Sequence, residues 1–490
     1  MRVLQVCAEI FPLLKTGGLA DVAGALPPAL AALGDEVRVL LPGFDAILDG
    51  LQEAVVVAEL QPPPALHWGS GGTRLLWGRL PAVGEGVTAY VIDAPGYYRR
   101  PGGPYADANR HPYGDNHLRF ALLGWVAAEL AQGLDPFWHP TVLHAHDWHA
   151  GLTPVYLRAA QQARHQHFAG SVFTVHNLAY QGGFAGHHFQ ELGLPSGFWG
   201  VNGVEFHGQI GFMKGGLYFA DRITTVSPTY AREIQGHEQG CGLDGLLRTR
   251  GVDLSGILNG VDDAVWHPAT DVLLPANYDV DALDGKAACK AALQQELGLT
   301  VDPARPLLCI VSRLTEQKGL HLVLEALPGL RALGWQFAML GSGDAWMETA
   351  FAEAAAAHPG DIAVRIGYDE RFAHRLIAGS DAIAVPSRFE PCGLTQLYGL
   401  KYGTLPLVRR VGGLADTVAD TRLETLDRDA TGFVFDEFSA GALLWAAERA
   451  AALFRRPADW RTVQQRAMRQ DFGWTAAARH YQALYRQVSA

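Results

Sequence analysis

The sequence predicts an α/β protein with two doubly wound, Rossmann-like domains. Short runs of apolar and β-branched residues alternate with helical patterns, which is typical of parallel sheets with helices on both faces. The alternation stops between residues 256 and 306, where turn signals such as Asn259-Gly260 surround one helical stretch, and then resumes. Because 490 residues are too many for one ordinary domain, we expect domains at residues 1–256 and 257–472, followed by a helix at 473–490.

The strands of both halves can be placed from their apolar runs. In the first half they include Val3–Cys7, Val37–Leu41, Ala89–Ile92, Val142–His144, Ser171–Val175 and Ile223–Val226, with clear helical patterns at Leu19–Leu33 and Leu118–Gln132. In the second half they are Leu307–Val311, Phe337–Leu340, Val364–Ile366, Ala382–Val385 and Leu405–Val408. Ligands of such open sheets bind beyond the carboxyl ends of the strands, so we expect the two domains to face an interdomain cleft, with a hinge near Asn259-Gly260.

The last helix has an apolar face whose partner the spacing does not identify. The apolar residues that recur at helical spacing are Trp474, Ala478, Tyr481, Tyr485 and Val488. This helix covers either its own second domain or, by crossing back, the first.

The composition restricts the compartment and the partners. With 39 Lys and Arg against 50 Asp and Glu, the net charge of −11 disfavours non-specific binding to nucleic acid or to anionic membranes. An anionic substrate therefore requires a local cationic pocket. The five cysteines are scattered, which fits a reducing cytosol, and neither a signal peptide nor a long apolar span is evident. We expect a cytoplasmic protein, and no pattern indicates its oligomeric state.

A glycine-rich segment joins the first predicted strand to the first predicted helix. In Lys15-Thr16-Gly17-Gly18-Leu19-Ala20-Asp21, the two glycines let the backbone approach a ligand, the helix start favours an anion, and Lys15 adds a positive charge. A plain glycine turn with a surface lysine is the alternative. The pentapeptide Gly-Gly-Leu-Ala-Asp recurs at residues 412–416 without a fixed period, which indicates a repeated loop rather than a repeat protein.

A histidine-rich segment, His144-Ala145-His146-Asp147-Trp148-His149, follows another strand. The pair His-x-His with a nearby Asp is found in zinc hydrolases, so a metallohydrolase is one interpretation. Those enzymes place the Asp directly before the third His, whereas Trp148 intervenes here, and neither His176 nor the pair His187-His188 completes a recognisable ligand set. The other interpretation, which we favour, is that Asp147 and some of these histidines bind sugar hydroxyls without a metal.

Two cationic residues follow the first strand of the second half. In Ser312-Arg313-Leu314-Thr315-Glu316-Gln317-Lys318-Gly319, both Arg313 and Lys318 lie at the predicted carboxyl end of a strand. Positive charge at this point neutralises a diphosphate and stabilises it as a leaving group. The alternative is a loop with two solvated basic side chains.

The densest motif runs from Pro386 to Gln396, between a predicted strand and a predicted helix. Glu390 is expected to project from this loop. Cys392 lies near the helix start, where a reactive thiol is conceivable, but a buried and inert thiol is the favoured interpretation. The residues that offer backbone N–H groups to a phosphate are Gly393, Leu394 and Thr395.

Together these segments resemble the starch and glycogen synthases of bacteria and plants, which are retaining glycosyltransferases of the GT-B fold. The agreement covers nearly the whole chain, is closest to the bacterial branch, and includes the Lys15–Asp21, His144–His149, Thr174–Asn177, Val226–Tyr230, Leu258–Asp262, Ser312–Gly319, Glu390–Gln396 and Gly412–Asp416 segments. The resemblance implies that glucose passes from ADP-glucose to the non-reducing end of an α-1,4-glucan, with no cofactor and no metal.

The resemblance also implies a role for each site residue. It assigns the diphosphate to Lys15, Arg313 and Lys318. It assigns the transferred glucose to Asp147 and His176, with Glu390 and Cys392 beside it. The remaining substrate-binding positions are Gly17, Gly18, Asp21, Tyr98, Asn259, Gly393, Leu394, Thr395 and Tyr368, the last of which stacks on the nucleobase.

The expected mechanism is attack on the front face of the sugar. Retention normally indicates two displacements through a carboxylate nucleophile, but the resemblance assigns sugar binding, not nucleophilic attack, to Asp147 and Glu390. We therefore expect the leaving diphosphate to accept the proton of the acceptor hydroxyl, with Arg313 and Lys318 stabilising its charge and the backbone carbonyl of His176 stabilising the sugar cation. A glucan-binding protein has no use for this cationic set, and a glucan phosphorylase requires a pyridoxal-binding lysine context that is not evident.

Overall fold

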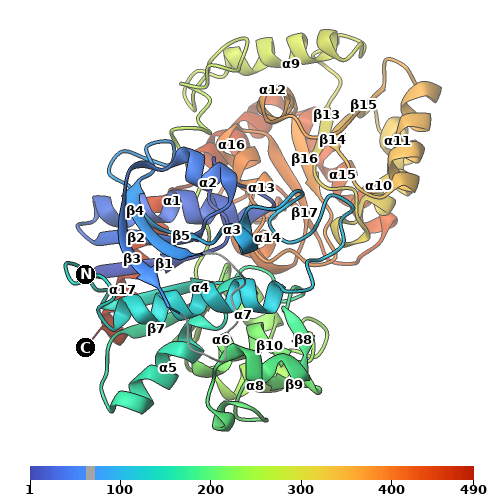
Figure 1. Ribbon diagram of the computed structural model, residues 1–490. Coiled ribbons are helices and arrows are strands. Elements are labelled where there is room, and N and C mark those ends of the chain that lie inside the picture. The colour runs from blue at the N-terminus through green and yellow to red at the C-terminus, as the bar shows by residue number, and fades with distance from the viewer. Residues whose placement is uncertain (62–71, 490) are drawn as a thin grey trace. The chain divides into compact units, whose positions relative to one another are not determined.

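The computed structural model describes residues 1–61 and 72–489, which form two compact units (Figure 1). The first unit comprises Met1–Val226, Ala231–Gly260 and Trp474–Ala490. The second comprises Ser227–Tyr230 and Val261–Gly473. The chain thus passes from one unit to the other directly after Gly260 and returns directly after Gly473.

The first unit is built on a nine-stranded sheet in the order β12-β11-β7-β6-β1-β2-β5-β4-β3. Seven neighbouring strands are parallel: β12 (Leu254–Gly256), β11 (Arg222–Thr225), β7 (Gly170–Val175), β6 (Val142–His146), β1 (Arg2–Val6), β2 (Glu36–Pro42) and β5 (Thr88–Asp93). At one edge β4 (Thr73–Arg79) and β3 (Gln52–Leu60) add antiparallel pairs. A separate small sheet contains β8 (Gly183–Ala185), β10 (Gln209–Gly211) and β9 (Glu205–Phe206).

Helices pack on both faces of this sheet, and they bury its central strands along their whole length. Every residue of β6 and of β7 is buried, which is characteristic of parallel strands packed on both faces. The helices of the unit are α1 (Gly18–Ala32), α2 (Asp45–Gly50), α3 (Pro95–Tyr98), α4 (Asn116–Ala131), α5 (Thr153–Arg164), α6 (Phe212–Phe219), α8 (Asp244–Thr249) and α17 (Trp474–Val488), with 3₁₀ turns η1 (Trp148–Ala150), η2 (Gly186–Leu192) and η3 (Ser196–Phe198).

The second unit contains a six-stranded parallel sheet in the order β15-β14-β13-β16-β17-β18. Its strands are β15 (Ile362–Ile366), β14 (Gln336–Gly341), β13 (Leu307–Val311), β16 (Ala382–Val385), β17 (Leu405–Arg409) and β18 (Phe433–Phe435). Its helices are α9 (Asp284–Glu296), α10 (Leu320–Ala332), α11 (Ala345–Ala357), α12 (Glu370–Gly379), α13 (Thr395–Lys401), α14 (Gly412–Thr417), α15 (Ala440–Phe454) and α16 (Pro457–Met468), with the turn η4 (Glu316–Lys318). Helix α7 (Pro228–Glu233) spans the boundary between the units.

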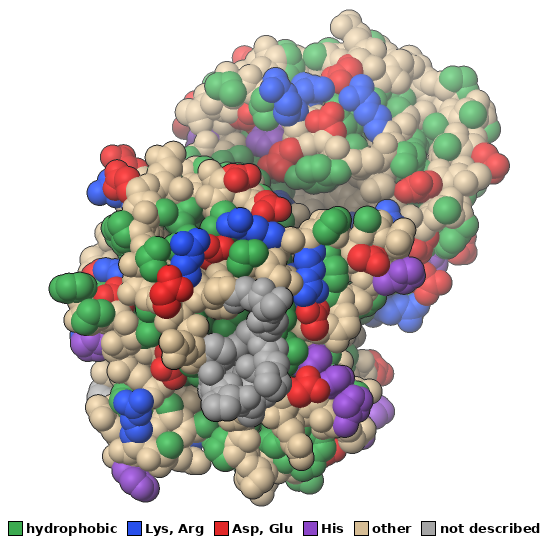
Figure 2. Space-filling view, viewed as in Figure 1, with side chains coloured by type: hydrophobic (Ala, Val, Ile, Leu, Met, Phe, Trp, Pro, Cys, Tyr) green, Lys and Arg blue, Asp and Glu red, His purple; other side chains and the backbone are tan. Residues whose placement is uncertain are grey.

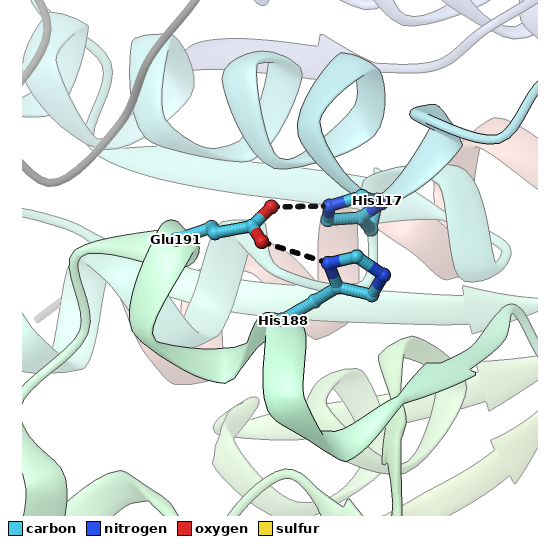
Figure 3. A group of neighbouring side chains, drawn as sticks. All are labelled: His117, His188 and Glu191. Carbon is cyan, nitrogen blue, oxygen red and sulfur yellow. Dashed lines mark hydrogen bonds and ion pairs between the residues drawn. The ribbon is translucent and has the colours of Figure 1, made fainter.

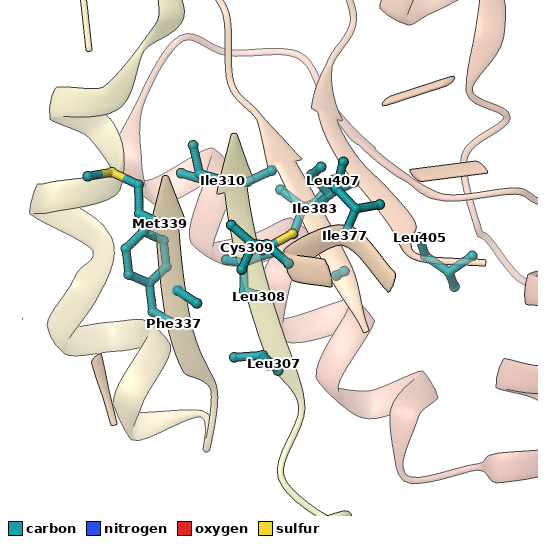
Figure 4. Packing of buried hydrophobic residues seen from close by; sticks show 14 of the residues in the cluster. Leu307, Leu308, Cys309, Ile310, Phe337, Met339, Ile377, Ile383, Leu405 and Leu407 are labelled. Carbon is teal, nitrogen blue, oxygen red and sulfur yellow. The ribbon is translucent and has the colours of Figure 1, made fainter. Parts of the chain in front are cut away.

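The core of the second unit is formed by side chains of neighbouring strands and of the helices on them. Figure 4 shows Leu308 and Ile310 of β13 beside Phe337 of β14, Ile383 of β16 and Leu407 of β17. All five are at most 1% exposed. At roughly 1.5–3 kcal/mol for each large apolar side chain removed from water, this cluster is a principal source of the unit's stability.

The C-terminal helix α17 packs in the core of the first unit. Trp474, Tyr481 and Tyr485 are buried with Val22 and Leu26 of α1, and the red helix lies among the blue elements in Figure 1. Close packing at the end of the helix requires a glycine on β7, because a Cβ atom at Gly170 would lie 2.0 Å from the carbonyl oxygen of Val488. This helix brings residues from the end of the chain next to those of its beginning.

The predicted α/β fold is confirmed, and each predicted strand appears with its ends within two residues of the predicted ones. The antiparallel edge β4-β3, the small sheet and the short parallel strands β12 and β18 were not predicted. Among the parallel strands of each sheet the strand order reverses once, between β1 and β6 in the first unit and between β13 and β16 in the second. Ligands of doubly wound folds bind beyond the carboxyl ends of strands at such reversals, so each unit has its own candidate half-site.

Charged side chains of both signs are mixed on the face of the protein that Figure 2 draws. Figure 2 shows Lys and Arg side chains interspersed with Asp and Glu rather than gathered into one basic field. Within residues 1–61 and 72–489, no helix is both long enough and apolar enough to cross a bilayer.

Candidate active site

In the first unit, the loop after β1 leaves its two glycines exposed. No atom lies within 4 Å of a Cβ atom built on Gly17 or Gly18, so a ligand has free access to this backbone. The buried carboxylate of Glu9 fixes the loop, since it accepts hydrogen bonds from the Thr16 backbone N–H and hydroxyl at 2.5 Å each. Lys15 is 30% exposed and pairs with Asp21 at 2.8 Å. The loop is therefore held at its base and open at the point where an anion is expected.

Asp147 lies at the carboxyl end of β6 in a strained backbone conformation. Its φ of 55° and ψ of −178° belong to a region that residues other than glycine rarely adopt, and such strain often marks functional positions. Its Oδ1 accepts a hydrogen bond of 2.7 Å from the backbone N–H of His176. Burial raises the pKa of Asp147 to about 7, although backbone hydrogen bonds from His176 and Asn177 oppose this. Two loops, after β6 and after β7, are thus joined by this carboxylate.

A chain of buried hydrogen bonds orients the imidazole of His176. The hydroxyl oxygen of Tyr485 accepts a hydrogen bond of 3.0 Å from Gln5 Nε2. The other end of the same amide, Gln5 Oε1, lies 2.5 Å from His146 Nε2. His146 Nε2 must then carry the proton, which leaves Nδ1 as the acceptor for His176 Nε2 at 3.0 Å. Burial lowers the pKa of His176 to about 3, so the ring is neutral at neutral pH, with its proton on Nε2. Tyr485 of the last helix therefore determines the tautomer of a predicted catalytic residue.

Two histidines of the metallohydrolase interpretation, His144 and His146, use both ring nitrogens in hydrogen bonds within the protein. His144 Nδ1 lies 2.7 Å from the Tyr485 hydroxyl, and its Nε2 lies 2.6 Å from the Thr174 hydroxyl. Both ring nitrogens of His146 are also hydrogen-bonded. His149 stacks on Tyr105 with ring centroids 4.5 Å apart. Neither His144 nor His146 offers a lone pair to a metal, and His144, completely buried, cannot bind a sugar hydroxyl.

Two other predicted binding residues of this unit differ in their surroundings. Asn259 is 7% exposed, and its Oδ1 has no hydrogen-bond partner in the described part of the chain. A buried acceptor without a donor costs free energy unless a ligand or water supplies one. Tyr98 is 2% exposed and donates its hydroxyl to the carbonyl of Arg119 at 2.6 Å. Its hydroxyl is committed to the fold, and substrate binding by Tyr98 stays a prediction.

In the second unit, the loops after β13 and β16 are joined by an ion pair. Lys318 Nζ lies 2.6 Å from Glu390 Oε2, and Ser387 donates its hydroxyl to the same oxygen at 2.8 Å. Glu390 is 7% exposed at its side chain and Lys318 is 20% exposed. Lys318 is thus not the solvated residue of the alternative interpretation: it is held in one position against a buried carboxylate.

Arg313 and Tyr368 are the exposed residues of this half-site. No described residue pairs with the guanidinium of Arg313, which is exposed in the loop after β13. Tyr368, between β15 and α12, is 75% exposed and donates its hydroxyl to Glu370. An exposed aromatic face is suited to stacking on a planar base, and an unpaired guanidinium is suited to a diphosphate.

The start of α13 is tightly built. Leu394 is the residue before the helix, which begins at Thr395, and Gly393 has a positive φ of 77°. Gln396 fixes the turn by donating to the carbonyls of Cys392 and Gly393 at 3.0 and 2.8 Å. Cys392 is 4% exposed, so its thiol is buried.

The two copies of Gly-Gly-Leu-Ala-Asp both begin a helix, but in opposite surroundings. At the first copy the glycines are open. At the second copy a Cβ atom on Gly412 would lie 1.8 Å from the carbonyl oxygen of Glu390, and one on Gly413 would lie 2.1 Å from that of Cys392. The glycines of the second copy are therefore packed directly against the backbone of the Glu390 loop.

Several functional neighbours were not predicted from the sequence. Four residues form hydrogen bonds to a predicted site residue or to its loop: Glu9, Gln5, Ser387 and Tyr485. Of the four, only Tyr485 was part of a sequence pattern, the apolar spacing of the last helix. The other three are polar residues in or beside strands, and their partners become evident only in three dimensions.

The chain is similar to known protein families and to solved structures. The family described as Starch synthase catalytic domain matches residues 2–249, and Glycosyl transferases group 1 matches residues 298–462. The solved catalytic domain of Starch Synthase IV from Arabidopsis thaliana, bound to ADP and acarbose, superposes with a TM-score of 0.86 at 30% identity, covering 99% of each chain. Sucrose-phosphate synthase from Thermosynechococcus elongatus, at 17% identity and a TM-score of 0.56, shares the fold. The predicted GT-B fold is thereby confirmed.

Curated relatives are similar over their whole length. A glycogen synthase from Leptothrix cholodnii is 72% identical, with all of both chains covered. One from Variovorax paradoxus is 62% identical, with 100% of this chain and 99% of the relative covered. Identity at this level, together with the two matched families, shows that the chain belongs to the glycogen and starch synthase family of glycosyltransferases.

Proposed function

We propose that the protein transfers glucose from ADP-glucose to the non-reducing end of an α-1,4-glucan, with retention of configuration. The observation that carries this proposal is the Lys318–Glu390 pair beside the unpaired Arg313, at the strand reversal of the second unit. Family membership supports the reaction class, and the ADP and acarbose bound to the plant relative support a nucleotide donor and a glucan acceptor.

The donor's diphosphate is assigned to cationic groups of both units. Arg313 offers a planar, two-pronged donor, and Lys318 offers a point charge whose position Glu390 fixes. Lys15 and the open backbone of Gly17 and Gly18 supply a third contact.

The transferred glucose is assigned to Asp147 and His176. Their mutual hydrogen bond of 2.7 Å fixes the carboxylate against the loop that follows β7. A carboxylate accepts hydrogen bonds from sugar hydroxyls, and the neutral ring of His176 adds an acceptor at Nδ1. Asn259 Oδ1, the buried acceptor without a donor among the described residues, is suited to a further hydroxyl.

The reaction breaks the bond between glucose C1 and the β-phosphate oxygen and forms a bond from C1 to the acceptor oxygen on the same face. The acceptor hydroxyl gives its proton to the departing phosphate oxygen, so ADP leaves with the bond's electron pair. Arg313 and Lys318 stabilise the negative charge that develops on this oxygen, and each such contact is typically worth about 10²–10³ in rate. The backbone carbonyl of His176 stabilises positive charge at C1.

The test is an incorporation assay with Lys318→Ala and a matched lysine control. Lys401 lies in the same unit, is 21% exposed and pairs with Asp263 at 2.6 Å, so it reproduces the exposure and ion-pair length of Lys318. With ADP-glucose and glycogen, kcat should fall by about 10²–10³ in Lys318→Ala and stay near wild type in Lys401→Ala. Equal activity of the two variants would refute the assignment of Lys318.

A donor comparison completes the test. The same assay with UDP-glucose measures how strictly the adenine is preferred, and NMR of the product should show new α-linked glucose. Products of β configuration would exclude retention.

A further inference from the structure

Three potential metal ligands converge in the first unit, outside the set of predicted site residues. His117 lies in the first turn of α4, and His188 and Glu191 lie three residues apart in η2. Figure 3 shows both imidazoles directed at the carboxylate of Glu191. One ligand atom from each residue lies within 4.8 Å of the other two.

We propose that His117, His188 and Glu191 bind one divalent transition-metal ion of the zinc type. His117 Nε2 lies 2.8 Å from Glu191 Oε2, and His188 Nδ1 lies 2.9 Å from Glu191 Oε1. Zinc bonds of about 2.0–2.2 Å in a tetrahedron place ligand atoms about 3.3 Å apart. The ion therefore requires these two contacts to widen by about half an ångström and the two imidazole nitrogens, which lie within 4.8 Å of one another, to reach the same spacing of about 3.3 Å. The carboxylate turns one oxygen toward the ion.

The donor set selects the class of ion. Two imidazole nitrogens and one carboxylate suit zinc, cobalt, nickel or copper, whereas magnesium and calcium favour sets composed of oxygen ligands. Three protein ligands leave one tetrahedral position for water or another small ligand. Solvent reaches this position, because the side chains of His188 and Glu191 are 27% and 42% exposed while that of His117 is 4% exposed.

The site differs from a strong structural zinc site in one respect. When Nε2 of His117 binds a metal, its ring proton moves to Nδ1, and this atom is buried with no partner in the described residues. Ligating histidines usually donate that second N–H to an acceptor, and losing such support typically costs 10–100-fold in affinity. We therefore expect reversible binding that a chelator removes readily. Without metal, both imidazoles donate to Glu191, so the ligands stay aligned.

A bound ion would connect the start of α4 with η2. Its effect would be on the stability of this part of the first unit, since the hydrogen bonds and ion pairs of its three ligands within the described residues join them to one another and not to the residues assigned to ADP-glucose transfer. Binding to the folded state alone raises the melting temperature with ion concentration. Metal-dependent stability combined with metal-independent transfer is therefore expected.

The experiment titrates the metal-free full chain with Zn²⁺ in a calorimeter and with Co²⁺ in a spectrophotometer. A Cys241→Ser background removes the exposed free thiol, which is itself a metal ligand. The variants are His117→Gln, His188→Gln and Glu191→Gln. The matched control is His187→Gln, because His187 neighbours His188, with ring centroids 4.1 Å apart, but lies outside the set.

We expect the background protein to bind one equivalent of Zn²⁺ and to show the Co²⁺ absorption of a site with two nitrogen ligands. Each of the three variants should weaken binding by at least about tenfold, abolish the rise in melting temperature with Zn²⁺, and retain glucan extension. His187→Gln should bind normally. Melting temperatures without metal exclude misfolded variants. Absence of one-equivalent binding, unchanged binding in any two of the three variants, or loss of binding in His187→Gln would overturn the proposal.

Discussion

Replacing Asp147 with asparagine should make the protein's stability less sensitive to pH while reducing its activity. Burial raises the pKa of Asp147 to about 7 from an ordinary value of 3.8. A carboxyl group with a raised folded pKa contributes stability that is fully present below about pH 4 and is lost as the pH rises through about 7. Asparagine has the same shape without the charge, so the loss should be absent in Asp147→Asn.

The magnitude follows from the two pKa values. Their difference of roughly three pH units, at about 1.4 kcal/mol each, gives an upper limit of about 4 kcal/mol at alkaline pH. This gain in stability is partly offset in Asp147→Asn. The asparagine side chain has an N–H₂ group in place of one acceptor oxygen, which weakens the hydrogen bonds from the loop after β7 by about 1 kcal/mol. Asp147→Asn should therefore be slightly less stable than wild type near pH 4 and more stable by up to about 3 kcal/mol near pH 8.

The assay is urea unfolding of both proteins at a series of pH values, with kcat measured in parallel. Asp271→Asn is an opposite control, because hydrogen bonds from His374 and Tyr402 outweigh burial and lower the pKa of Asp271. Asp271 contributes stability that is lost only as the pH falls below about 4, so this variant should be destabilised by a constant amount between about pH 5 and 8. Parallel stability profiles for wild type and Asp147→Asn would refute the reasoning.

Three further predictions concern the transfer reaction. Glucan extension should proceed at full rate in excess chelator, since cationic side chains supply the charge; activity lost under chelator and restored by zinc would favour a catalytic metal. Arg313→Lys should lower kcat, because lysine keeps the charge but loses the two-pronged geometry, and should leave the melting temperature unchanged, because Arg313 has no partner among described residues. Tyr485→Phe should lower kcat and change the ¹⁵N NMR tautomer signature of His176, whereas Tyr156→Phe, which loses a buried hydrogen bond to the Leu192 carbonyl, should do neither.

The sequence predicted the longer parallel strands because a run of several buried residues carries a local signal, whereas the three-residue strands β12 and β18 are too short to show one. Strand β13, for example, is a run of five apolar residues with the predicted ends. Strand β3 lacks such a signal: most of its residues are exposed, and Val55 and Val56 are about half exposed. Its place in the sheet depends on antiparallel pairing with β4, and pairing between distant segments has no local pattern.

The sequence motifs predicted which residues belong to the site, but they did not predict which of these residues contact one another. The resemblance identified both Lys318 and Glu390, yet the ion pair between them joins residues 72 positions apart. A lysine in a loop has the same sequence signal whether it is solvated or held at 2.6 Å from a buried carboxylate. The two copies of Gly-Gly-Leu-Ala-Asp illustrate the same limit, because identical residues are open at Gly17 and tightly packed at Gly412.

The link between Tyr485 and His176 shows why the last helix matters to the chemistry. Gln5 and Tyr485 are 480 positions apart, and their hydrogen bond forms only when α17 packs on the first unit. Without the Tyr485 hydroxyl, the Gln5 amide is free to rotate and present its N–H₂ group to His146, which would reverse the proton positions along the chain to His176. Packing of the C-terminal helix therefore fixes a protonation pattern at the predicted glucose site as well as covering an apolar face.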